Sequence, residues 1–278
     1  MRFARWQTRY RMRGRALRLE FDWIDEARFI AVPGMPGSTG PLYVGLYEYS
    51  DMAFVLDLLR AGDCFVDVGA NVGSYTVLAG VACGAEVHAF EPNEDACDVL
   101  FANIRANRAE NNVKVYPMVV GDSDGELEFT CDQDATNHVV TSTPLRLEST
   151  VRTPAVRLDS VLGEVDPTVL KIDVEGWELP VLRGAGDLLG KASLLACLVE
   201  INRSLERYGF QQSDVVEVLH AEGFREVGYD PRYRVLTDPP QIRANNALFV
   251  RDSEAVIARL SDAPSRKVFG RRMKHSPS

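Results

Sequence analysis

The segment Cys64–Gly73, with the sequence CFVDVGANVG, limits the fold of this chain more than any other stretch. Its first half is short, apolar and rich in β-forming residues, which predicts a buried parallel strand that carries Asp67. Two glycines then break the run, and a helix is expected to start at Ser74. A strand, a glycine turn and a helix N-terminus together let a ligand approach free backbone N–H groups. The segment therefore predicts a nucleotide or nucleoside site.

The spacing of this turn excludes two common kinds of nucleotide site. A dinucleotide fingerprint needs a second glycine where Asn71 stands. A P-loop ends in Gly-Lys followed by Ser or Thr, which this turn lacks. The turn is therefore expected to hold a nucleoside without a pyrophosphate. The alternative is a tight strand-to-helix connection without a ligand, but it gives no reason for a buried aspartate in the strand.

Strands and helices alternate after this segment, which predicts an α/β fold with a mostly parallel sheet and helices on both faces. The further strands expected are Glu86–Phe90, Val113–Val120, Thr168–Val174 and Ser193–Ile201, with a final pair at Phe224–Tyr229 and Asn246–Arg251. Residues 121–156 break the alternation and are expected to form short antiparallel strands, an insertion on the sheet edge.

The two ends of the chain differ in composition from its body. Residues 1–42 are expected to be a basic segment followed by a small β-hairpin, residues 43–252 the main domain, and residues 253–278 a basic tail. No apolar run is long enough for a transmembrane helix, and no secretory signal follows the basic N-terminus. Five scattered cysteines without a C-x-x-C pair predict buried free thiols in a cytoplasmic protein and argue against structural zinc.

Charge is distributed unevenly along the chain. Residues 1–18 carry seven arginines and residues 264–278 five basic residues, and neither segment carries an acid. The rest of the chain therefore has 19 basic against 40 acidic residues, a net charge of −21. Such an acidic body excludes nucleic acid as a partner. The basic ends are either solvated tails or a peripheral contact with an anionic membrane or an acidic partner.

Ligands of open α/β sheets bind beyond the carboxyl ends of the strands, so the residues that follow each strand are the candidates for a site. An acid after the second strand, Glu91, is placed to accept hydrogen bonds from both ribose hydroxyls. Asn93 caps the next helix, and Asp122 follows the third strand beside the expected purine. The residues expected to hold the cofactor are Asp67, Gly69, Asn71, Gly73, Glu91, Asn93 and Asp122.

Strands four and five end in acidic residues that are candidates for ligand binding or catalysis. A carboxylate or a histidine there can accept a proton, and the remaining polar groups can bind a substrate. The expected proton acceptors are Asp173, Glu175, Glu200 and His138, and the expected substrate-binding residues are Lys171, Glu178 and Asn202. Structural alternatives stay open, because Lys171 and Asp173 can form an ion pair that only fixes the strand end. Glu200 and Asn202 can equally close the following turn.

Four motifs in this order, FVDVGANVGSYT, FEPN, LKIDVEGWELPVLRGA and VEIN, resemble the FkbM family of S-adenosylmethionine-dependent methyltransferases. The likeness covers roughly Tyr47–Arg251. It implies a Rossmann-like class I methyltransferase fold with six parallel strands and one antiparallel strand. It also implies methyl transfer, most often to a hydroxyl of a sugar or a natural product.

By position, the resemblance assigns roles to several of these residues. The first glycine turn and Asp67 would line the amino-acid and ribose parts of the cofactor, and Glu91 would hold the ribose hydroxyls. Asp122 would lie near the adenine, and Asp173 near the methyl-bearing sulfur. The acceptor is expected to be a small molecule or a glycan, and its binding residues are inferred from position alone.

Three alternatives remain open. Asp173, Glu200 and Asn202 resemble the oxygen ligands of catechol-type methyltransferases, so Mg²⁺ could bind a diol there. The metal is not favoured, because an acid cluster can hold a polyol without it. An NAD(P)-dependent oxidoreductase is disfavoured by Asn71, and a non-catalytic protein that keeps the fold is the third alternative.

Overall fold

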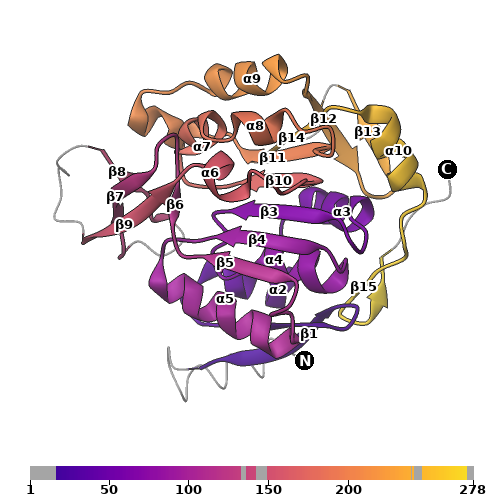
Figure 1. Ribbon diagram of the computed structural model, residues 1–278. Coiled ribbons are helices and arrows are strands. Elements are labelled where there is room, and N and C mark those ends of the chain that lie inside the picture. The colour runs from indigo at the N-terminus through magenta and orange to yellow at the C-terminus, as the bar shows by residue number, and fades with distance from the viewer. Residues whose placement is uncertain (1–16, 133–135, 142–148, 239, 241–245, 274–278) are drawn as a thin grey trace.

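The computed structural model describes residues 17–132, 136–141, 149–238, 240 and 246–273. Its centre is an eight-stranded sheet with the strand order β13-β12-β14-β11-β10-β3-β4-β5 (Figure 1). The strands are β3 (Cys64–Val68), β4 (Glu86–Phe90), β5 (Val113–Tyr116), β10 (Val169–Ile172), β11 (Ala196–Glu200), β12 (Arg225–Asp230), β13 (Val235–Thr237) and β14 (Asn246–Val250).

The directions of these strands make a mixed sheet. Strands β5, β4, β3, β10 and β11 are parallel, whereas β14 runs antiparallel to both β11 and β12. The family resemblance implied seven strands, but the sheet has eight. The additional strand is β13, which the turn at residues 231–234 places antiparallel beside β12. The predicted final antiparallel pair, β12 with β14, is confirmed.

Helices cover both faces of the sheet, as the apolar strands require. Phe65 of β3 faces one layer, whereas its neighbour Val66 faces the other. The first layer holds α3 (Tyr49–Leu58), α4 (Ser74–Val77) with η2 (Leu78–Ala82), α5 (Glu94–Asn107) and α10 (Ser253–Ser261); the second holds α6 (Leu158–Leu162), α7 (Glu178–Arg183), α8 (Gly186–Leu189) and α9 (Gln212–Ala221). This α/β arrangement is Rossmann-like. No helix within the described ranges is long and apolar enough to cross a bilayer.

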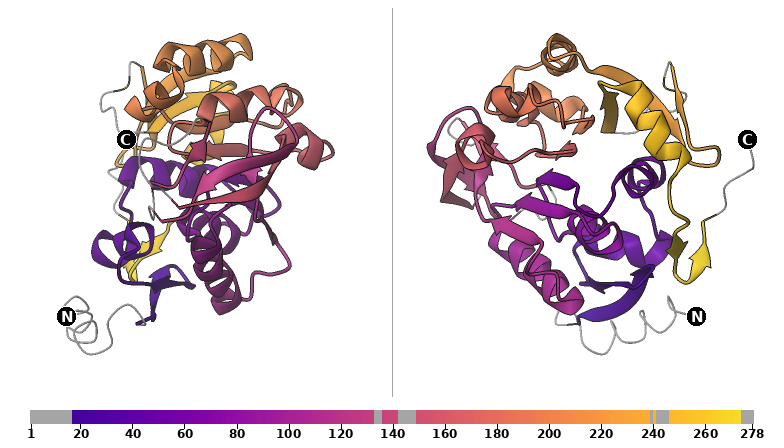
Figure 2. Two further views of the ribbon diagram at one scale, coloured as in Figure 1. Left: turned by 90° about the vertical axis from the view of Figure 1, so that its left-hand side faces the viewer. Right: turned by 45° about the vertical axis from the view of Figure 1, so that its right-hand side comes forward.

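The predicted N-terminal hairpin forms from β1 (Leu19–Ile24) and β2 (Ala27–Ala31). It is extended by β15 (Lys267–Val268) and β16 (Arg271–Arg272), so the chain ends share one small sheet. Figure 2 shows these C-terminal strands beside β1. The described part of the expected basic tail is thus folded, and Arg266 donates hydrogen bonds to Asp25 Oδ2 at 3.3 Å and to the Ala82 carbonyl at 2.6 Å. The arginines before residue 17 lie outside the described residues.

The expected edge insertion forms a second, separate sheet. Its strands are β6 (Val119–Val120), β7 (Gly125–Thr130), β8 (Val139–Val140) and β9 (Thr150–Val156), in the order β6-β9-β7-β8. The single strand expected over Val113–Val120 divides, because β5 ends at Tyr116 and β6 pairs with β9 instead of β4. In Figure 1 this sheet lies at the carboxyl ends of β3 and β4. It is therefore placed to form a wall over the expected ligand site.

A close backbone contact joins the second sheet to α7. Gly184 caps the C-terminal end of α7, and a Cβ atom there would overlap the carbonyl oxygen of Gly121, which directly follows β6. Only glycine lets the two backbones approach this closely. The glycine of the LRGA motif thus has a packing role.

We expect Gly184→Ala to lower the free energy of unfolding by about 1–3 kcal/mol, because the added methyl must displace backbone. Gly190→Ala is the matched control, since a Cβ there meets its nearest atoms at 3.5 Å. It should be neutral or stabilise by less than about 1 kcal/mol. Urea titration of both variants measures the difference, and equal stabilities would contradict the packing role.

Candidate active site

A cavity of about 290 Å³ lies beyond the carboxyl ends of β3, β4, β10 and β11. The second sheet and the N-terminal part of α2 (Pro36–Val44) complete its walls. Eight of the residues expected at the site line it together: Asp67, Gly69, Asn71, Glu91, Lys171, Asp173, Glu175 and Glu200. Residues from four separate strands thus meet at one edge of the sheet, as the parallel architecture predicts.

The glycine turn after β3 brings the first of these residues against the end of β10. Gly69 has a φ of 79°, and a Cβ atom there would overlap the carbonyl oxygen of Asp173. Asn71, with a φ of 51°, is also left-handed, which is uncommon for a residue with a side chain. The turn is therefore specialised to bring its backbone close to Asp173.

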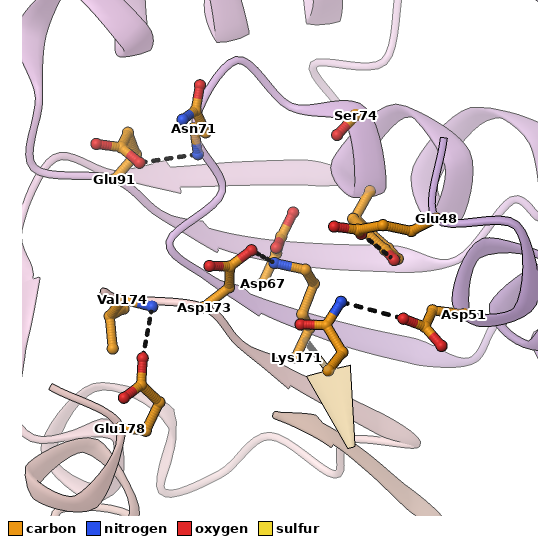
Figure 3. A network of polar contacts seen from close by, with 12 residues as sticks. Glu48, Asp51, Asp67, Asn71, Ser74, Glu91, Lys171, Asp173, Val174 and Glu178 are labelled. Carbon is orange, nitrogen blue, oxygen red and sulfur yellow. Dashed lines mark hydrogen bonds and ion pairs between the residues drawn. The ribbon is translucent and has the colours of Figure 1, made fainter. Parts of the chain in front are cut away.

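Glu91 is held by two backbone donors at the end of β4. The Asn71 N–H donates to Oε2 at 2.8 Å (Figure 3). The Asn93 N–H donates to Oε1, also at 2.8 Å. Each carboxylate oxygen keeps one lone pair for a further donor. Burial raises the pKa of Glu91 to about 7. Two oxygens fixed side by side at a cavity wall fit the vicinal hydroxyls of a ribose.

A buried lysine lies at the floor of the cavity. Lys171 is 3% exposed and its Nζ donates to Asp173 Oδ2 at 2.9 Å (Figure 3). The ammonium also stands 4.9 Å from the ring centre of Tyr75. Burial alone would lower the pKa of Lys171, but the carboxylates of Asp173, Asp67 and Glu48 outweigh it and raise that pKa. The lysine therefore stays charged and balances part of the acidic lining.

Asp67, on the neighbouring strand, has one partner and one open oxygen. Its Oδ2 accepts a hydrogen bond from the Thr76 hydroxyl at 2.7 Å. Its Oδ1 is buried and has no hydrogen-bond partner among the described residues. Because Asp67 lines the cavity, this oxygen is an acceptor available to a polar ligand group, such as an amine.

Three carboxylates form a cluster at the other side of the cavity. One oxygen each from Asp173, Glu175 and Glu200 lies within 4.8 Å of the other two. Burial, followed by the charge of Asp173, raises the pKa of Glu175 to about 7 and that of Glu200 to about 9. Glu175 has a φ of 56°, so a second non-glycine residue at the cavity adopts the left-handed region. The cluster is arranged to bind a proton or a cation.

Glu178 stabilises the backbone turn that carries Glu175. Its Oε1 accepts a hydrogen bond from the backbone N–H of Val174 at 3.1 Å (Figure 3). It accepts a second one from the N–H of Gly176 at 3.0 Å. The residue is fully buried and does not line the cavity. Arg207 adds a hydrogen bond to the Glu175 carbonyl at 2.9 Å. Glu178, expected to bind substrate, thus holds the turn that presents Glu175.

The remaining expected site residues do not line the cavity. Asn202 Oδ1 accepts from the Ser204 N–H at 2.6 Å and caps η4 (Arg203–Tyr208). His138 has its Nδ1 3.1 Å from the Thr136 carbonyl oxygen. Asp122 is exposed. Gly73 precedes α4, and Asn93 caps α5 by accepting from the Ala96 N–H at 2.8 Å while its own N–H holds Glu91.

Most of the apolar wall was not predicted. Most of these apolar residues lie in the second sheet or in the segment that leads into it, and one follows the Glu175–Gly176 turn. They are Met118, Val119, Phe129, Val139 and Trp177. In sequence they look like ordinary core residues. The loop before α3 adds Tyr47, whose hydroxyl lies 2.8 Å from Ser74 Oγ, and Glu48, which accepts from the Tyr75 hydroxyl at 2.7 Å.

The α/β fold thus carries a cavity with the glycine turn and Glu91 on one side and three clustered carboxylates on the other. Residues 67–229 match the sequence model described as the methyltransferase FkbM domain. The chain therefore belongs to the FkbM family of S-adenosylmethionine-dependent methyltransferases, which confirms the resemblance seen in its motifs.

Two curated relatives and one solved structure are similar to this chain. Hexuronic acid methyltransferase AglP of Haloferax volcanii is 30% identical over 177 residues, covering 62% of this chain and 67% of that protein. The 31-O-demethyl-FK506 methyltransferase FkbM of Streptomyces tacrolimicus is 33% identical over 164 residues, covering 46% and 62%. The crystal structure of methyltransferase FkbM from Methylobacillus flagellatus KT has a TM-score of 0.46 and 18% identity, covering 73% and 50%.

We expect Glu91→Gln to weaken binding of S-adenosylhomocysteine by about 10- to 100-fold, because an amide offers the ribose one acceptor oxygen where the carboxylate offers two. Glu94→Gln is the matched control, since Glu94 is exposed on α5. Isothermal titration measures both affinities. Equal affinities for the two variants would show that Glu91 does not contact the ligand.

The pKa of Glu91, about 7, adds a pH dependence to this binding. Below pH 7 the carboxyl is protonated and loses acceptor capacity, so the affinity of the unmodified protein for S-adenosylhomocysteine should fall as the pH is lowered from 8 to 6. The Glu91→Gln variant should lack this change. A flat profile for the unmodified protein would contradict the proposed contact.

Proposed function

We propose that this protein transfers the methyl group of S-adenosylmethionine to a hydroxyl of a sugar, a glycan or a glycosylated natural product. The observation that carries the proposal is that the nucleoside cradle and the cluster of Asp173, Glu175 and Glu200 share one cavity. The names of two relatives support a sugar or a natural product as the class of acceptor, although the hexuronic acid that names one of them is acidic, unlike the neutral acceptor argued below.

The charges of the cavity favour a neutral polyol as acceptor. Lys171 is the single basic residue among the described residues that line it, and its ammonium is already paired with Asp173. Six acidic residues line the same cavity: Glu48, Asp67, Glu91, Asp173, Glu175 and Glu200. An acidic acceptor would be repelled there, whereas hydroxyl groups can donate hydrogen bonds to these carboxylates.

The residues of the cradle and the wall would hold the donor. Glu91 would accept from its ribose hydroxyls and Asp67 Oδ1 from its amino group, while Met118 and Phe129 would cover its adenine ring and exclude water. When bound, S-adenosylmethionine supplies an electrophilic methyl group. The protein then has to orient one hydroxyl toward it and remove one proton.

Glu175 is the proton acceptor in this scheme. Its pKa of about 7 matches neutral conditions, which is where a general base works best. Glu200, with a pKa of about 9, is protonated at neutral pH and can donate a hydrogen bond to a neighbouring acceptor hydroxyl. Asp173, fixed by Lys171, would accept from another hydroxyl and so select which one reacts. His138 is not needed as a base, since it does not line the cavity.

The partner and the compartment are part of the same proposal. A small hydroxyl-bearing molecule or the end of a glycan would enter the cavity. Nucleic acid is not expected as an acceptor, because the chain between its basic ends is strongly acidic. A cytoplasmic reaction remains the prediction from the five scattered cysteines. Four of these, Cys64, Cys83, Cys97 and Cys197, are buried free thiols.

We expect Glu175→Gln to lower turnover by about 10²- to 10⁴-fold, because the amide cannot accept the proton. Its affinity for S-adenosylhomocysteine should stay within a few-fold of the unmodified protein. Glu206→Gln, an exposed change on η4, is the control and should keep full turnover. The assay follows labelled methyl transfer to neutral glycosides and to uronosides.

Two results would contradict the proposal. Unchanged turnover of Glu175→Gln would remove Glu175 as the base. Transfer that yields only methyl esters of uronosides, with no methyl ether on any glycoside, would show that the acceptor group is not a hydroxyl.

A further inference from the structure

The carboxylates of Asp173, Glu175 and Glu200 lie so close together that all three can be ionised at once only beside a cation. One oxygen of each lies within 4.8 Å of the others, and the ammonium of Lys171 reaches only Asp173. We propose that these three carboxylates bind a hard divalent cation such as Mg²⁺.

A buried oxygen in the cluster points to a missing ligand. Glu200 is 9% exposed, and its Oε2 is buried without a hydrogen-bond partner among the described residues. Buried polar atoms are nearly always satisfied, because an unpaired one loses its hydration without compensation. Glu200 lines the cavity together with the other two carboxylates, so the partner it lacks would come from the cavity. A cation there would satisfy it and relieve the repulsion with Asp173 and Glu175.

The donor set fits the chemistry of Mg²⁺. All three ligands are carboxylate oxygens, which hard divalent cations prefer. Ligands at ~2.1 Å from one Mg²⁺ lie about 3 Å apart when adjacent and about 4 Å apart when opposite. A side-chain adjustment of roughly 1 Å or less would bring the present spacing of up to 4.8 Å into this range.

The ligand set differs from the one that the sequence suggested. Asn202 was the expected third ligand, but its Oδ1 accepts from the Ser204 N–H and caps η4. Glu175 takes its place, because the left-handed turn that Glu178 supports presents this carboxylate beside Asp173. Three protein ligands leave positions of an octahedral ion open to water or to an acceptor.

The cation site also has a consequence for the class of acceptor, and this consequence rests on the proposed function. Two open positions suit neighbouring hydroxyls, so the acceptor would be a vicinal diol, and the cation would lower the pKa of the reacting hydroxyl. If Glu175 gave the cation one oxygen, its second oxygen would remain to take the proton from the hydroxyl, as in the scheme without a cation. Glu200 would then be an ionised ligand of the cation instead of a protonated hydrogen-bond donor.

Binding of Mn²⁺ to the full chain, stripped with EDTA and desalted, tests the site directly. Loss of the free Mn²⁺ signal in electron paramagnetic resonance should show one ion bound per chain, and excess Mg²⁺ should release it. Glu200→Gln should weaken Mn²⁺ binding at least about 10- to 100-fold. Glu217→Gln, an exposed change on α9, is the matched control and should bind as the unmodified chain does. Retained S-adenosylhomocysteine binding shows that each variant is folded.

No bound Mn²⁺ in the unmodified chain, or equal binding by Glu200→Gln, would overturn the site. The role of the cation in catalysis can be tested separately from the proposed function. Methyl transfer to a hydroxyl at full rate in EDTA would show that catalysis does not need the cation, and it would still support the proposed function. Mn²⁺ binding without transfer to any hydroxyl acceptor would support the site and contradict the proposed function.

Discussion

The buried ammonium of Lys171 is the interaction on which the rest of the site depends. Lys171 lies opposite Asp67 in the pairing of β10 with β3, and Asp173 comes two residues later, directly after the end of β10. Side chains at these positions point to the same face of the sheet. Without a positive charge between them, the buried Asp67 would face the partly exposed Asp173 with no compensation for its own charge, which is costly for a buried carboxylate. Lys171 thus permits an acidic floor under the cavity.

Two parts of the cavity lie above this floor. On one side are the glycine turn after β3 and Glu91 after β4, the proposed cradle for the donor. On the other side are Asp173, Glu175 and Glu200, the proposed acidic cluster for the acceptor. The close approach of Gly69 to the Asp173 carbonyl fixes the two sides relative to each other. The second sheet forms one wall of the cavity.

The sequence predicted the positions of the proposed cradle residues well, because these residues follow directly after strands. The boundaries of β4 and the cap of α5 at Asn93 agree with the prediction, and Glu91 follows as the residue after the strand. It could not predict whether an acid after a strand faces the cavity or the backbone behind it. Glu175 and Glu178 are three residues apart, yet one lines the cavity and the other bonds to backbone N–H groups.

Long-range pairing was also beyond the sequence. The two-residue strands β15 and β16 carry no periodic pattern, and their place beside β1 depends on contacts such as Arg266 with Asp25. Likewise, Val119 and Val139 read as ordinary core residues until the second sheet turns them toward the cavity. The apolar wall of the site follows from tertiary structure and not from a motif.

The central claim is that the charge of Lys171 stabilises the chain through Asp173, and a double-mutant cycle in urea tests it most directly. We predict that Lys171→Met lowers the free energy of unfolding by about 3–5 kcal/mol, because it leaves buried carboxylates uncompensated. In the Asp173→Asn background the same substitution should cost at least about 1 kcal/mol less. An equal cost of Lys171→Met in both backgrounds would contradict the claim.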